Sequence, residues 1–536
     1  MPPPSNVDER APLLAHQVHG ERASAVAVVV SPSSSSVTEV EIPNQEACSH
    51  QRTLDFKLFK SLLVDSIPGN WVLIAKTWIV ILSYTLQNSI QTVSVVIAGR
   101  LGPDELSVAA FSLMLAFVTG DRWCVALGGT TALDTLGSQA FTGGSKPTDL
   151  SIHFQRCLVI LWSMLIPVSL VWAFIEPILL SLGQPPALSR DVQQFLRVLI
   201  FGAPGYIGFE SLKKYLQCQG GSRIMGASTI ILAIVSPINI LLHIGLIHHT
   251  SLGILGSPLA LSITYWICFL LLGVLTYFSP KHKENGTWGG VHLGEVLSFT
   301  SCYQFLQLAI PGILMVGTEW AAFEIVALAA GRLGAIPLAA QSVIMTTDQI
   351  LNTIPFGIGV AASTRVGNLI GSRDAPGAKH AAHASALTSV IVGALVMVVM
   401  IAFKDVYGYF FSDDKDVVLL VSEVMPLVAS FQVADGLAGS CGGVLRGQGR
   451  QHLGALFNIV AYYVLALPMG LTLAFHPRAD LGLQGLWIGQ VVALFIVGIG
   501  EYCVVWLGTD WEKEVQLGIE RNRNETKLHS SSGIPE

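Results

Sequence analysis

The chain has very little charge for its length. Only 12% of its 536 residues are Asp, Glu, Lys or Arg, whereas soluble domains carry about 25%. Hydrophobic residues make up 51% of the chain, and its mean hydropathy is +0.59. These values exclude a soluble globular protein. The net charge of -6 is small, so the composition gives no indication of a nucleic-acid partner.

Paired cysteines and catalytic signatures are also missing from the sequence. The eight cysteines are scattered singly, with no CxxC spacing and no Cys/His cluster, so neither a disulfide framework nor a zinc site is expected. No HExxH or GxSxG motif is present, which argues against an enzyme. We therefore expect no catalytic residue, no metal and no cofactor. The N-terminus has no apolar h-region, which argues against a secretory signal peptide.

Long apolar runs are what the sequence has in abundance. Each is close to the length of about 20 residues that a helix needs to cross a bilayer, and helices are expected because lipid leaves few other ways to satisfy backbone hydrogen bonds. The predicted fold class is an all-α integral membrane protein with twelve transmembrane helices. The predicted spans cover residues 72–97, 106–133, 157–182, 194–214, 224–248, 253–278, 303–331, 338–363, 382–403, 417–442, 454–475 and 483–507.

Polar segments flank and divide these spans. Lys and Arg predominate in the loops on the side of both termini, which predicts that this side is cytoplasmic. Residues 1–55 are polar and include a Ser run, so we expect a disordered cytoplasmic tail. Its Glu9–Leu14 peptide has the acidic dileucine pattern that sorting adaptors bind, which favours a vacuolar or other acidic endomembrane location over the plasma membrane as the alternative. The other predicted boundaries are an N-lobe at 56–280, an inter-lobe cytoplasmic linker at 281–300, a C-lobe at 301–510 and a cytoplasmic C-terminal tail at 511–536.

The two halves of the chain repeat one another. Residues 215–220, YLQCQG, align with residues 444–449, VLRGQG, at a shift of 229 (449 − 220). The pentapeptide AGRLG occurs at 98–102 and again at 330–334, a shift of 232 (330 − 98). Each half has an even number of spans, so both halves share one orientation. The repeat predicts two six-helix bundles related by a pseudo-two-fold axis along the membrane normal, with a cavity between them.

Carboxylates interrupt the apolar spans of the second half. Glu319 and Glu324 lie in the seventh span and Asp435 in the tenth. The positions that match them in the first half carry no charge and are Gln87, Thr92 and Tyr206. An ionisable side chain in the hydrocarbon region is costly, so it marks a functional site. We expect Glu319 and Asp435 to form the core of a site for coupling ion and substrate, with Glu324 in support, about 140° around the helix from Glu319.

Polar residues are predicted to line the cavity between the lobes. Four of them follow the i, i+3, i+4, i+7 spacing of one helix face in the first span, although such a stripe also suits hydrogen bonding between packed helices. The predicted lining residues are Tyr84, Gln87, Asn88, Gln91, Tyr206, Asn458 and Tyr462.

Other ionisable residues are interpreted as structural. Glu210 lies three and four residues before Lys213 and Lys214, the spacing of an ion pair on a helix surface. Asp134 is expected to anchor a loop at the cytoplasmic end of the second span. Asp121 and Arg122 are adjacent and can neutralise each other or neighbouring charges.

Four motifs resemble those of eukaryotic multidrug and toxic compound extrusion (MATE) transporters. They are P-x7-E-W-x-x-F-E at 311–324, VAASTRVGN at 360–368, TALDTLGSQAF at 131–141 and DGLAGSCGGVLRGQG at 435–449. The match covers about residues 65–510, and the Ser-rich N-terminus and short C-terminal tail are most similar to fungal members. The resemblance implies a two-lobed, twelve-helix antiporter of organic cations and other amphiphiles in which Glu319, Glu324 and Asp435 are the functional acids. Where animal relatives often carry a further Glu, this chain has Thr346, with Asp348 two residues on.

These features discriminate among several function classes. A secondary antiporter that exports or sequesters organic cations and amphiphilic xenobiotics or metabolites by alternating access explains both the repeat and the acids; the proton is the expected coupling ion and sodium the alternative. A two-lobed flippase for lipid-linked substrates is the runner-up, but it needs a cationic cavity for phosphates. An intramembrane enzyme has no supporting motif, and a receptor or scaffold leaves the carboxylates unexplained.

The expected partners are small amphiphilic or cationic substrates, the lipid bilayer and a sorting adaptor at Glu9–Leu14, with no nucleic acid, and the protein is expected to be a monomer.

Overall fold

The described part of the chain is helical throughout. The computed structural model describes residues 67–531, except 99, 120–124, 182, 221, 412 and 413. The predicted tail at 1–55, its Glu9–Leu14 peptide and the Asp121–Arg122 pair lie outside the described residues. The part that is described consists of helices and their connections and contains no β-strand. The all-α class predicted from the apolar runs is therefore confirmed.

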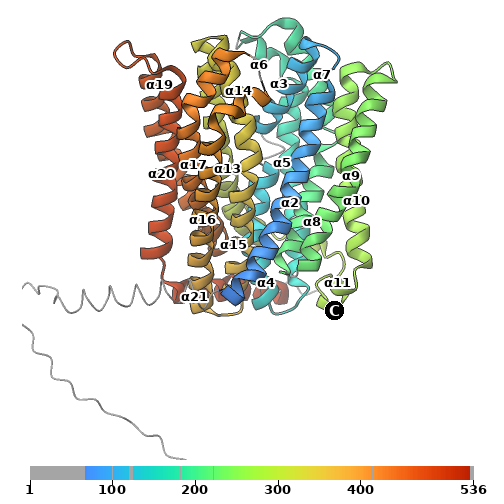
Figure 1. The fold of residues 1–536 in the computed structure, drawn as a ribbon. Helices are drawn as coiled ribbons and strands as arrows, with labels where there is room; N and C mark the ends of the chain where they lie inside the picture. The colour runs from blue at the N-terminus through green and yellow to red at the C-terminus, as the bar shows by residue number, and fades with distance from the viewer. Residues whose placement is uncertain are drawn as a thin grey trace, which may run out of the picture. The chain divides into compact units, whose positions relative to one another are not determined.

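The first half of the described chain, called the N-lobe below, ends at Phe278 (Figure 1). The fourth predicted span of this lobe is built from two helices, and the second includes residues 120–124, which lie outside the described residues. The two helices of the fourth span are bent by 52°, and Gly202 and Pro204 stand at their junction. The N-lobe elements are α2 (Ile67–Ala98), α3 (Pro103–Thr119), α4 (Ala126–Gly143), α5 (Asp149–Ala173), α6 (Glu176–Ser181), α7 (Pro186–Leu199), α8 (Ala203–Cys218), α9 (Ser222–His248), η2 (Gly253–Leu255) and α10 (Gly256–Phe278).

The second half, called the C-lobe, repeats this order of elements after the short helices α11 (Pro280–Asn285) and α12 (Leu293–Val296). Its eighth predicted span is interrupted only at Asn352. Its eleventh span changes to a π-helix before Pro468, which has no N–H to donate to the preceding turn. The C-lobe elements are α13 (Phe299–Leu333), α14 (Ala335–Leu351), α15 (Thr353–Gly371), α16 (Ala375–Tyr407), η3 (Gly408–Phe410), α17 (Lys415–Gln448), α18 (Gln451–Asn458), η4 (Ile459–Ala466), α19 (Leu467–Phe475) and α20 (Gly482–Leu507).

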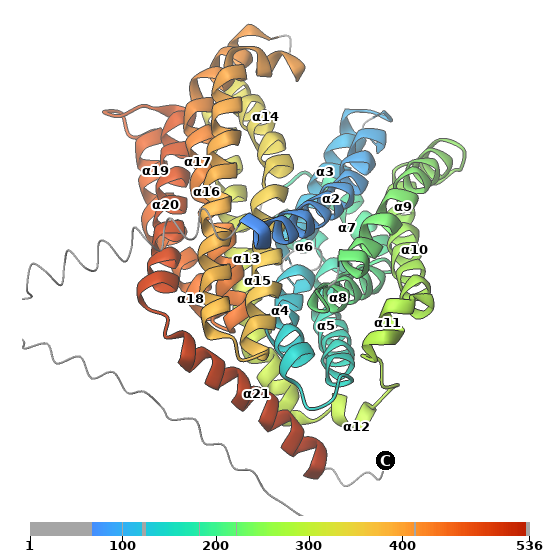
Figure 2. The same cartoon turned by 60° about the horizontal axis from the view of Figure 1, so that its bottom comes forward.

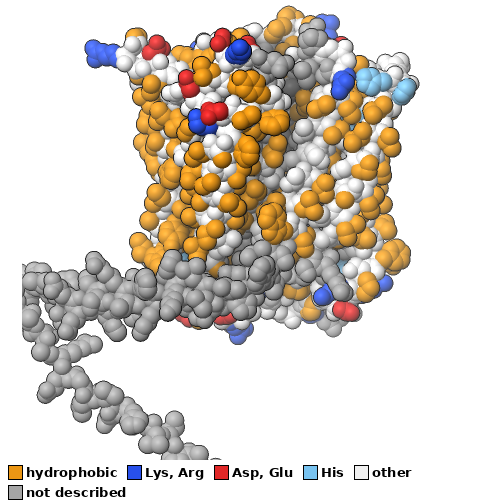
Figure 3. Space-filling view, in the orientation of Figure 1, with side chains coloured by type: hydrophobic (Ala, Val, Ile, Leu, Met, Phe, Trp, Pro, Cys, Tyr) orange, Lys and Arg blue, Asp and Glu red, His pale blue; other side chains and the backbone are white. Residues whose placement is uncertain are grey.

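Membrane-spanning helices are readily recognised in both lobes. Nine of the described helices are long and apolar enough to cross a membrane, or ten if the bent pair α7 and α8 counts as one span. The second and eighth predicted spans are not among these helices: the eighth consists of the two shorter helices α14 and α15, and part of the second lies outside the described residues. Figure 3 shows hydrophobic side chains over the middle of the visible face and charged side chains toward its two ends. This distribution suits a bilayer with water on both sides.

Each lobe has its own hydrophobic core. The N-lobe core includes the fully buried Phe195 and Leu261, and the C-lobe core includes Phe431 and Trp487. Helix α13 takes part in both, because Phe305 packs in the N-lobe core while later residues of the helix pack in the C-lobe core. This helix therefore connects the two lobes mechanically as well as along the chain.

Close packing within the C-lobe explains the glycine-rich motif at 435–449. A Cβ atom on Gly439 would lie 2.9 Å from the carbonyl oxygen of Pro355, and one on Gly443 would lie 2.1 Å from that of Gly359. A larger residue at either position would push α17 away from α15. The motif thus holds the helix that carries both Asp435 and Arg446 close against its neighbour.

Several elements join the lobes: α2 of the N-lobe packs against α15 of the C-lobe, and α4 and the last described helix add further contacts. Helix α4 of the N-lobe packs against α13, α15 and α17 of the C-lobe, and a Cβ on Gly128 would lie 2.5 Å from the Cα of Ile313. Residues 511–531, predicted only as a tail, form a further helix, α21 (Trp511–Ser531). Helix α21 contacts α15 and α16 of the C-lobe and α4 of the N-lobe (Figure 2). Contacts between the lobes are thus reinforced by the end of the chain.

Candidate functional site

A small cavity inside the C-lobe gathers acidic side chains from three helices. Glu319 from α13, Asp435 from α17 and Glu501 from α20 line it, and its volume is about 50 Å³. One water needs about 10–15 Å³ by this measure, whereas sites for drug-sized ligands measure roughly 300–1,000 Å³. The acid cavity therefore has room for an ion and a few waters, but not for an organic substrate.

The structure brings two of the three predicted acids together in this acid cavity. Asp435 is 3% exposed, and Asn352 Nδ2 donates a hydrogen bond to its Oδ2 at 3.2 Å. Glu319 is half-buried and lines the same space. Glu324 is also half-buried, but it is not among the residues that line the cavity. The five-residue spacing on α13 separates the two glutamates, as the helical geometry predicted.

Glu501 is a fourth acid that the sequence analysis missed. It is fully buried, and neither of its carboxylate oxygens has a hydrogen-bond partner among the described residues. Two glycines leave room for it: a Cβ on Gly454 would lie 3.0 Å from Oε1, and one on Gly442 would lie 3.4 Å from Oε2. The sequence signal that could have revealed Glu501 is a lone carboxylate in the twelfth apolar span. At the repeat shift of 229, the matching position in the first half is the uncharged Leu272 (501 − 229).

Asp348 and Thr346 have different surroundings. Asp348 is 4% exposed and accepts a hydrogen bond from Gln432 Nε2 at 3.3 Å. Thr346 is exposed and donates to the carbonyl of Ser342 at 2.8 Å. Neither residue lines the acid cavity. A buried carboxylate is thus present near the position where animal relatives carry Glu, but on another face of α14.

Arg446 lies between the acid cavity and the N-lobe. Among the described lining residues it is the one cationic side chain. Its Nε is 3.6 Å from Oδ2 of Asp134 on α4. Asp134 is fully buried and accepts hydrogen bonds from Lys214 Nζ at 2.9 and 3.0 Å. Asp134 therefore contributes to an ion-pair network that spans the two lobes, in addition to any role at its helix end.

The ion pair predicted at Glu210 is present, but the prediction that it lies on the helix surface is wrong. Glu210 and Lys213 are fully buried, with Lys213 Nζ 2.7 Å from Glu210 Oε1. Helices α4, α5, α9 and α10 all contact α8, and the three-residue spacing reveals nothing about such neighbours. Gln87 completes the cluster: its Nε2 donates to Glu210 Oε1 at 2.7 Å and to Tyr206 OH at 3.1 Å, and its Oε1 accepts from Lys213 at 2.7 Å.

The seven predicted lining residues have separate environments. Tyr84, Gln87 and Tyr206 belong to the buried N-lobe cluster, in which Lys213 Nζ is 3.9 Å from the centroid of the Tyr84 ring. Asn458 is the one of the seven that lines the acid cavity in the described part of the chain, and it donates to the carbonyl of Met315 at 2.7 Å. Gln91 is 8% exposed, Asn88 is half-buried, and Tyr462 is fully buried in the C-lobe core. Within the described residues, no group of three or more His, Cys, Asp or Glu is arranged to hold a metal ion.

Repeated lobes of membrane-spanning helices with buried carboxylates are typical of a membrane transporter. The family model MatE matches residues 80–244 and 311–472, and the chain belongs to this family of multidrug and toxic compound extrusion transporters. It is therefore a multi-pass membrane transporter and not an enzyme.

Curated relatives and solved structures agree with this family. The chain is 38% identical over 441 residues to "Uncharacterized transporter C4B3.13" of Schizosaccharomyces pombe, covering 82% of this chain and 79% of the relative. It is 34% identical to "Multidrug and toxin extrusion protein 2" of Mus musculus, covering 81% and 74%. The solved structure of the eukaryotic MATE transporter AtDTX14 matches with a TM-score of 0.77 and 29% identity, over 85% of this chain and 99% of that one.

Proposed function

We propose that the protein is a proton-coupled antiporter of organic cations and other amphiphiles, in which Glu319, Asp435 and Glu501 bind the coupling protons. The observation that supports this most directly is the convergence of three carboxylates on one small cavity with Arg446 as the one described cation. Burial and mutual repulsion both disfavour three negative charges in such a space. A proton relieves this repulsion, so loading and releasing protons is the natural chemistry of the site.

Sodium is the alternative coupling ion. The carboxylates lie next to Asn352 and Asn458, so oxygen ligands of the kind that hard cations prefer are available. A proton needs no ligand shell, however, and it neutralises a carboxylate whose charge burial disfavours. The substrate is expected to bind elsewhere, since the cavity is too small for it.

Arg446 provides a physical route from the acids to the arrangement of the lobes. Its guanidinium is shared between the acid cavity and Asp134 of the N-lobe. Deprotonated acids compete with Asp134 for this cation, and protonated acids do not. Protonation therefore favours the Arg446–Asp134 contact between the lobes, and deprotonation weakens it. Binding equilibria are reciprocal: if one arrangement of the lobes binds protons more tightly than another, proton binding shifts the equilibrium toward that arrangement.

The test is uptake of tetraethylammonium into proteoliposomes under an imposed pH gradient or an imposed sodium gradient. We expect uptake with the pH gradient alone, and a loss of about tenfold or more in its initial rate for Glu319→Gln and for Asp435→Asn. Glu423→Gln is the matched control, because Glu423 is an exposed carboxylate on α17, the helix that carries Asp435, and it should retain most of the rate. Normal exchange by the Glu319 and Asp435 variants, or exchange driven by sodium alone, would contradict the proposal.

The location of the protein belongs to the same proposal. An acidic endomembrane compartment, favoured by the Glu9–Leu14 peptide, would supply the proton gradient. Replacing Leu13 and Leu14 by Ala should then redistribute the protein in cells, as seen by fluorescence microscopy. An unchanged distribution would remove the support for this location.

A further inference from the structure

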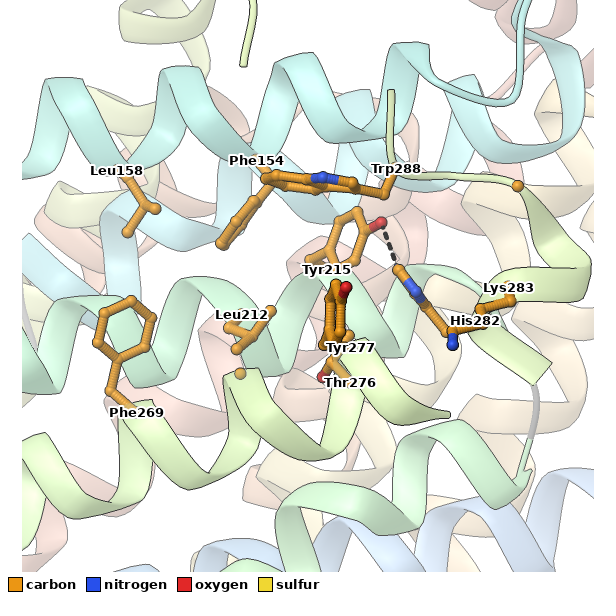
Figure 4. A pocket seen from close by; sticks show the side chains of 12 residues that line it. Phe154, Leu158, Leu212, Tyr215, Phe269, Thr276, Tyr277, His282, Lys283 and Trp288 are labelled. Atoms are coloured by element: carbon orange, nitrogen blue, oxygen red, sulfur yellow. Dashed lines mark hydrogen bonds between the residues drawn. The ribbon is translucent and has the colours of Figure 1, made fainter. Parts of the chain in front are cut away.

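A second and much larger cavity lies in the N-lobe and shares no lining residue with the acid cavity. Its volume is about 620 Å³, and it is lined from α5, α8, α10 and α11 and the segment after α11. Helix α8 packs against both α5 and α10, so Leu212 and Tyr215 form the floor between two helical walls. We call this space the α8 groove. Figure 4 shows Leu158 and Phe269 at one end of it and His282 and Lys283 at the other.

The interior of the α8 groove is apolar. Phe154, Leu158, Leu212 and Phe269 contribute hydrocarbon and aromatic surface. Polar groups in its walls are paired within the protein: Tyr215 OH is 2.9 Å from His282 Nε2 (Figure 4). Tyr215 OH also lies 2.7 Å from Thr287 Oγ1, and Thr276 donates to the carbonyl of Leu272. Burial lowers the pKa of His282 below its usual value, so this side chain is neutral near pH 7. The part of a ligand that enters the groove must therefore be hydrocarbon.

Gly273 leaves free space on the α10 wall. No atom lies within 4 Å of a Cβ placed at this position, and the residue lines the groove. The adjacent surface of α10 carries Leu270 and Val274, which are 58% and 54% exposed. Exposed leucine and valine on a membrane-spanning helix face lipid. The groove is thus flanked by the surface that meets the hydrocarbon of the bilayer.

The other end of the α8 groove has the composition of a lipid headgroup region. Tyr277 and Trp288 are 68% and 48% exposed, and such aromatic residues collect at the membrane–water boundary. Lys283 Nζ is 5.6 Å from the centroid of the Tyr277 ring, and Lys281 is exposed on the same short helix. Glu284 is the one acidic residue of α11, so the two lysines give this end a positive balance that attracts anionic headgroups.

We propose that the α8 groove binds an acyl chain of an anionic phospholipid, with the phosphate and headgroup held at Lys281 and Lys283. The proposal is independent of the transport function, because none of the residues involved lines the acid cavity. An organic cation is a poor occupant, since the lysines at the mouth repel it. The volume suits one lipid chain better than an ion.

The experiment is native mass spectrometry of the full chain in detergent, titrated with dioleoylphosphatidylserine or with dioleoylphosphatidylcholine. The wild-type protein should retain one phosphatidylserine in preference to phosphatidylcholine. Gly273→Phe fills the free space in the groove and should lower this binding on the order of tenfold. Gly245→Phe on α9 is the matched control, because a Cβ there also has no atom within 4 Å and the residue is outside the groove; it should bind as the wild type does.

A second variant tests the headgroup independently of the groove. Lys281→Ala with Lys283→Ala changes only exposed side chains, so folding is preserved, and phosphatidylserine should then bind no better than phosphatidylcholine. Equal binding of the two lipids by the wild type, or unchanged binding by Gly273→Phe, would overturn the proposal. Displacement of phosphatidylserine by equimolar oleate or tetraethylammonium would overturn it as well, by assigning the groove to a fatty acid or to a transport substrate.

Discussion

Glu501 illustrates how a single residue can carry a functional argument. A buried carboxylate normally has several hydrogen-bond donors or a cation as partners, because an unpaired charge inside a protein is expensive. Glu501 is fully buried with both oxygens unpaired among the described residues, and two glycines make space for it. A protonated side chain carries this cost far more easily than a charged one. We therefore count Glu501 among the proton-binding groups.

The first residue-scale prediction concerns this side chain. Glu501→Gln keeps the shape of a protonated glutamate, so the thermal unfolding temperature should stay within a few degrees or rise, because no partner is lost. The pH dependence of exchange should change, since one titrating group is removed. Both are measured on purified protein, by intrinsic fluorescence on heating and by initial uptake rates between pH 5 and 8. A variant with unchanged pH dependence would show that Glu501 takes no part in coupling.

The buried acids of the spans could be identified from the sequence more readily than the side chains that contact them. Glu319 and Asp435 could be singled out because a carboxylate in an apolar span is costly wherever it points. The environment of Glu210 could not, because spacing along one helix shows which residues share a face but not which helices cover that face. Glu501 could have been identified in the same way, because it is also a carboxylate within an apolar span. It follows that the identity of buried acids can be read from the sequence, whereas their partners require the packed structure.

At the scale of elements, α21 is the least expected part of the fold. Its sequence is strongly polar, yet Trp511, Glu514, Val515 and Gly518 are buried at i, i+3, i+4, i+7 spacing. Near its other end, Glu525 accepts hydrogen bonds from Arg156 of α5 at 2.9 Å and from Ser301 of α13 at 3.3 Å. The break between α14 and α15 is another difference from the sequence-based pattern. Apolar runs locate spans, but breaks within them depend on tertiary contacts.

An element-scale prediction tests how firmly α21 is held. Glu525→Ala removes the carboxylate that pairs with the fully buried Arg156, which keeps its bonds to the carbonyls of Glu295 and Val296. We expect a loss of about 1–3 kcal/mol in the free energy of unfolding. Glu520→Ala, at an exposed position of the same helix, should change it by less than about 0.5 kcal/mol. Chemical unfolding followed by fluorescence measures both, and equal effects would show that the Arg156 pair is not what holds α21.

At the scale of the whole molecule, the lobes meet where α4 packs against α13, α15 and α17 and where α2 packs against α15, and α21 contacts both lobes. Gln139 of α4 donates to the carbonyl of Gly447 at 2.9 Å, and Arg446 is close to Asp134. Alternating access requires these contacts to open in part of the cycle. The lobe repeat could be predicted from the sequence, but the contacts could not, because they join residues about 300 positions apart.

Arg446→Gln should make this inter-lobe surface more accessible. The change removes the cation beside Asp134, which keeps its pair with Lys214. The probe is Ser138→Cys in a Cys503→Ser background, since Ser138 is fully buried and faces Gly367 of α15. We expect faster labelling by a membrane-impermeant maleimide. The control is Arg450→Gln, because Arg450 contacts Thr509 and Glu514 rather than the N-lobe; equal labelling of the two variants would contradict a role of Arg446 in holding the lobes together.

The last prediction concerns how a proton gradient performs work in the whole molecule. If protons and substrate stabilise opposite arrangements of the lobes, each weakens the binding of the other by the same factor. Each pH unit corresponds to about 1.4 kcal/mol, so exchange of one proton for one monovalent cation supports about tenfold accumulation per unit. Such exchange moves no net charge. We therefore expect accumulation of tetraethylammonium in proteoliposomes to rise about tenfold per unit of imposed pH difference and to be unaffected by a potassium-clamped membrane potential. A strong dependence on voltage would mean that more than one proton moves per cation, and more than one of the three carboxylates would then have to release its proton in each cycle.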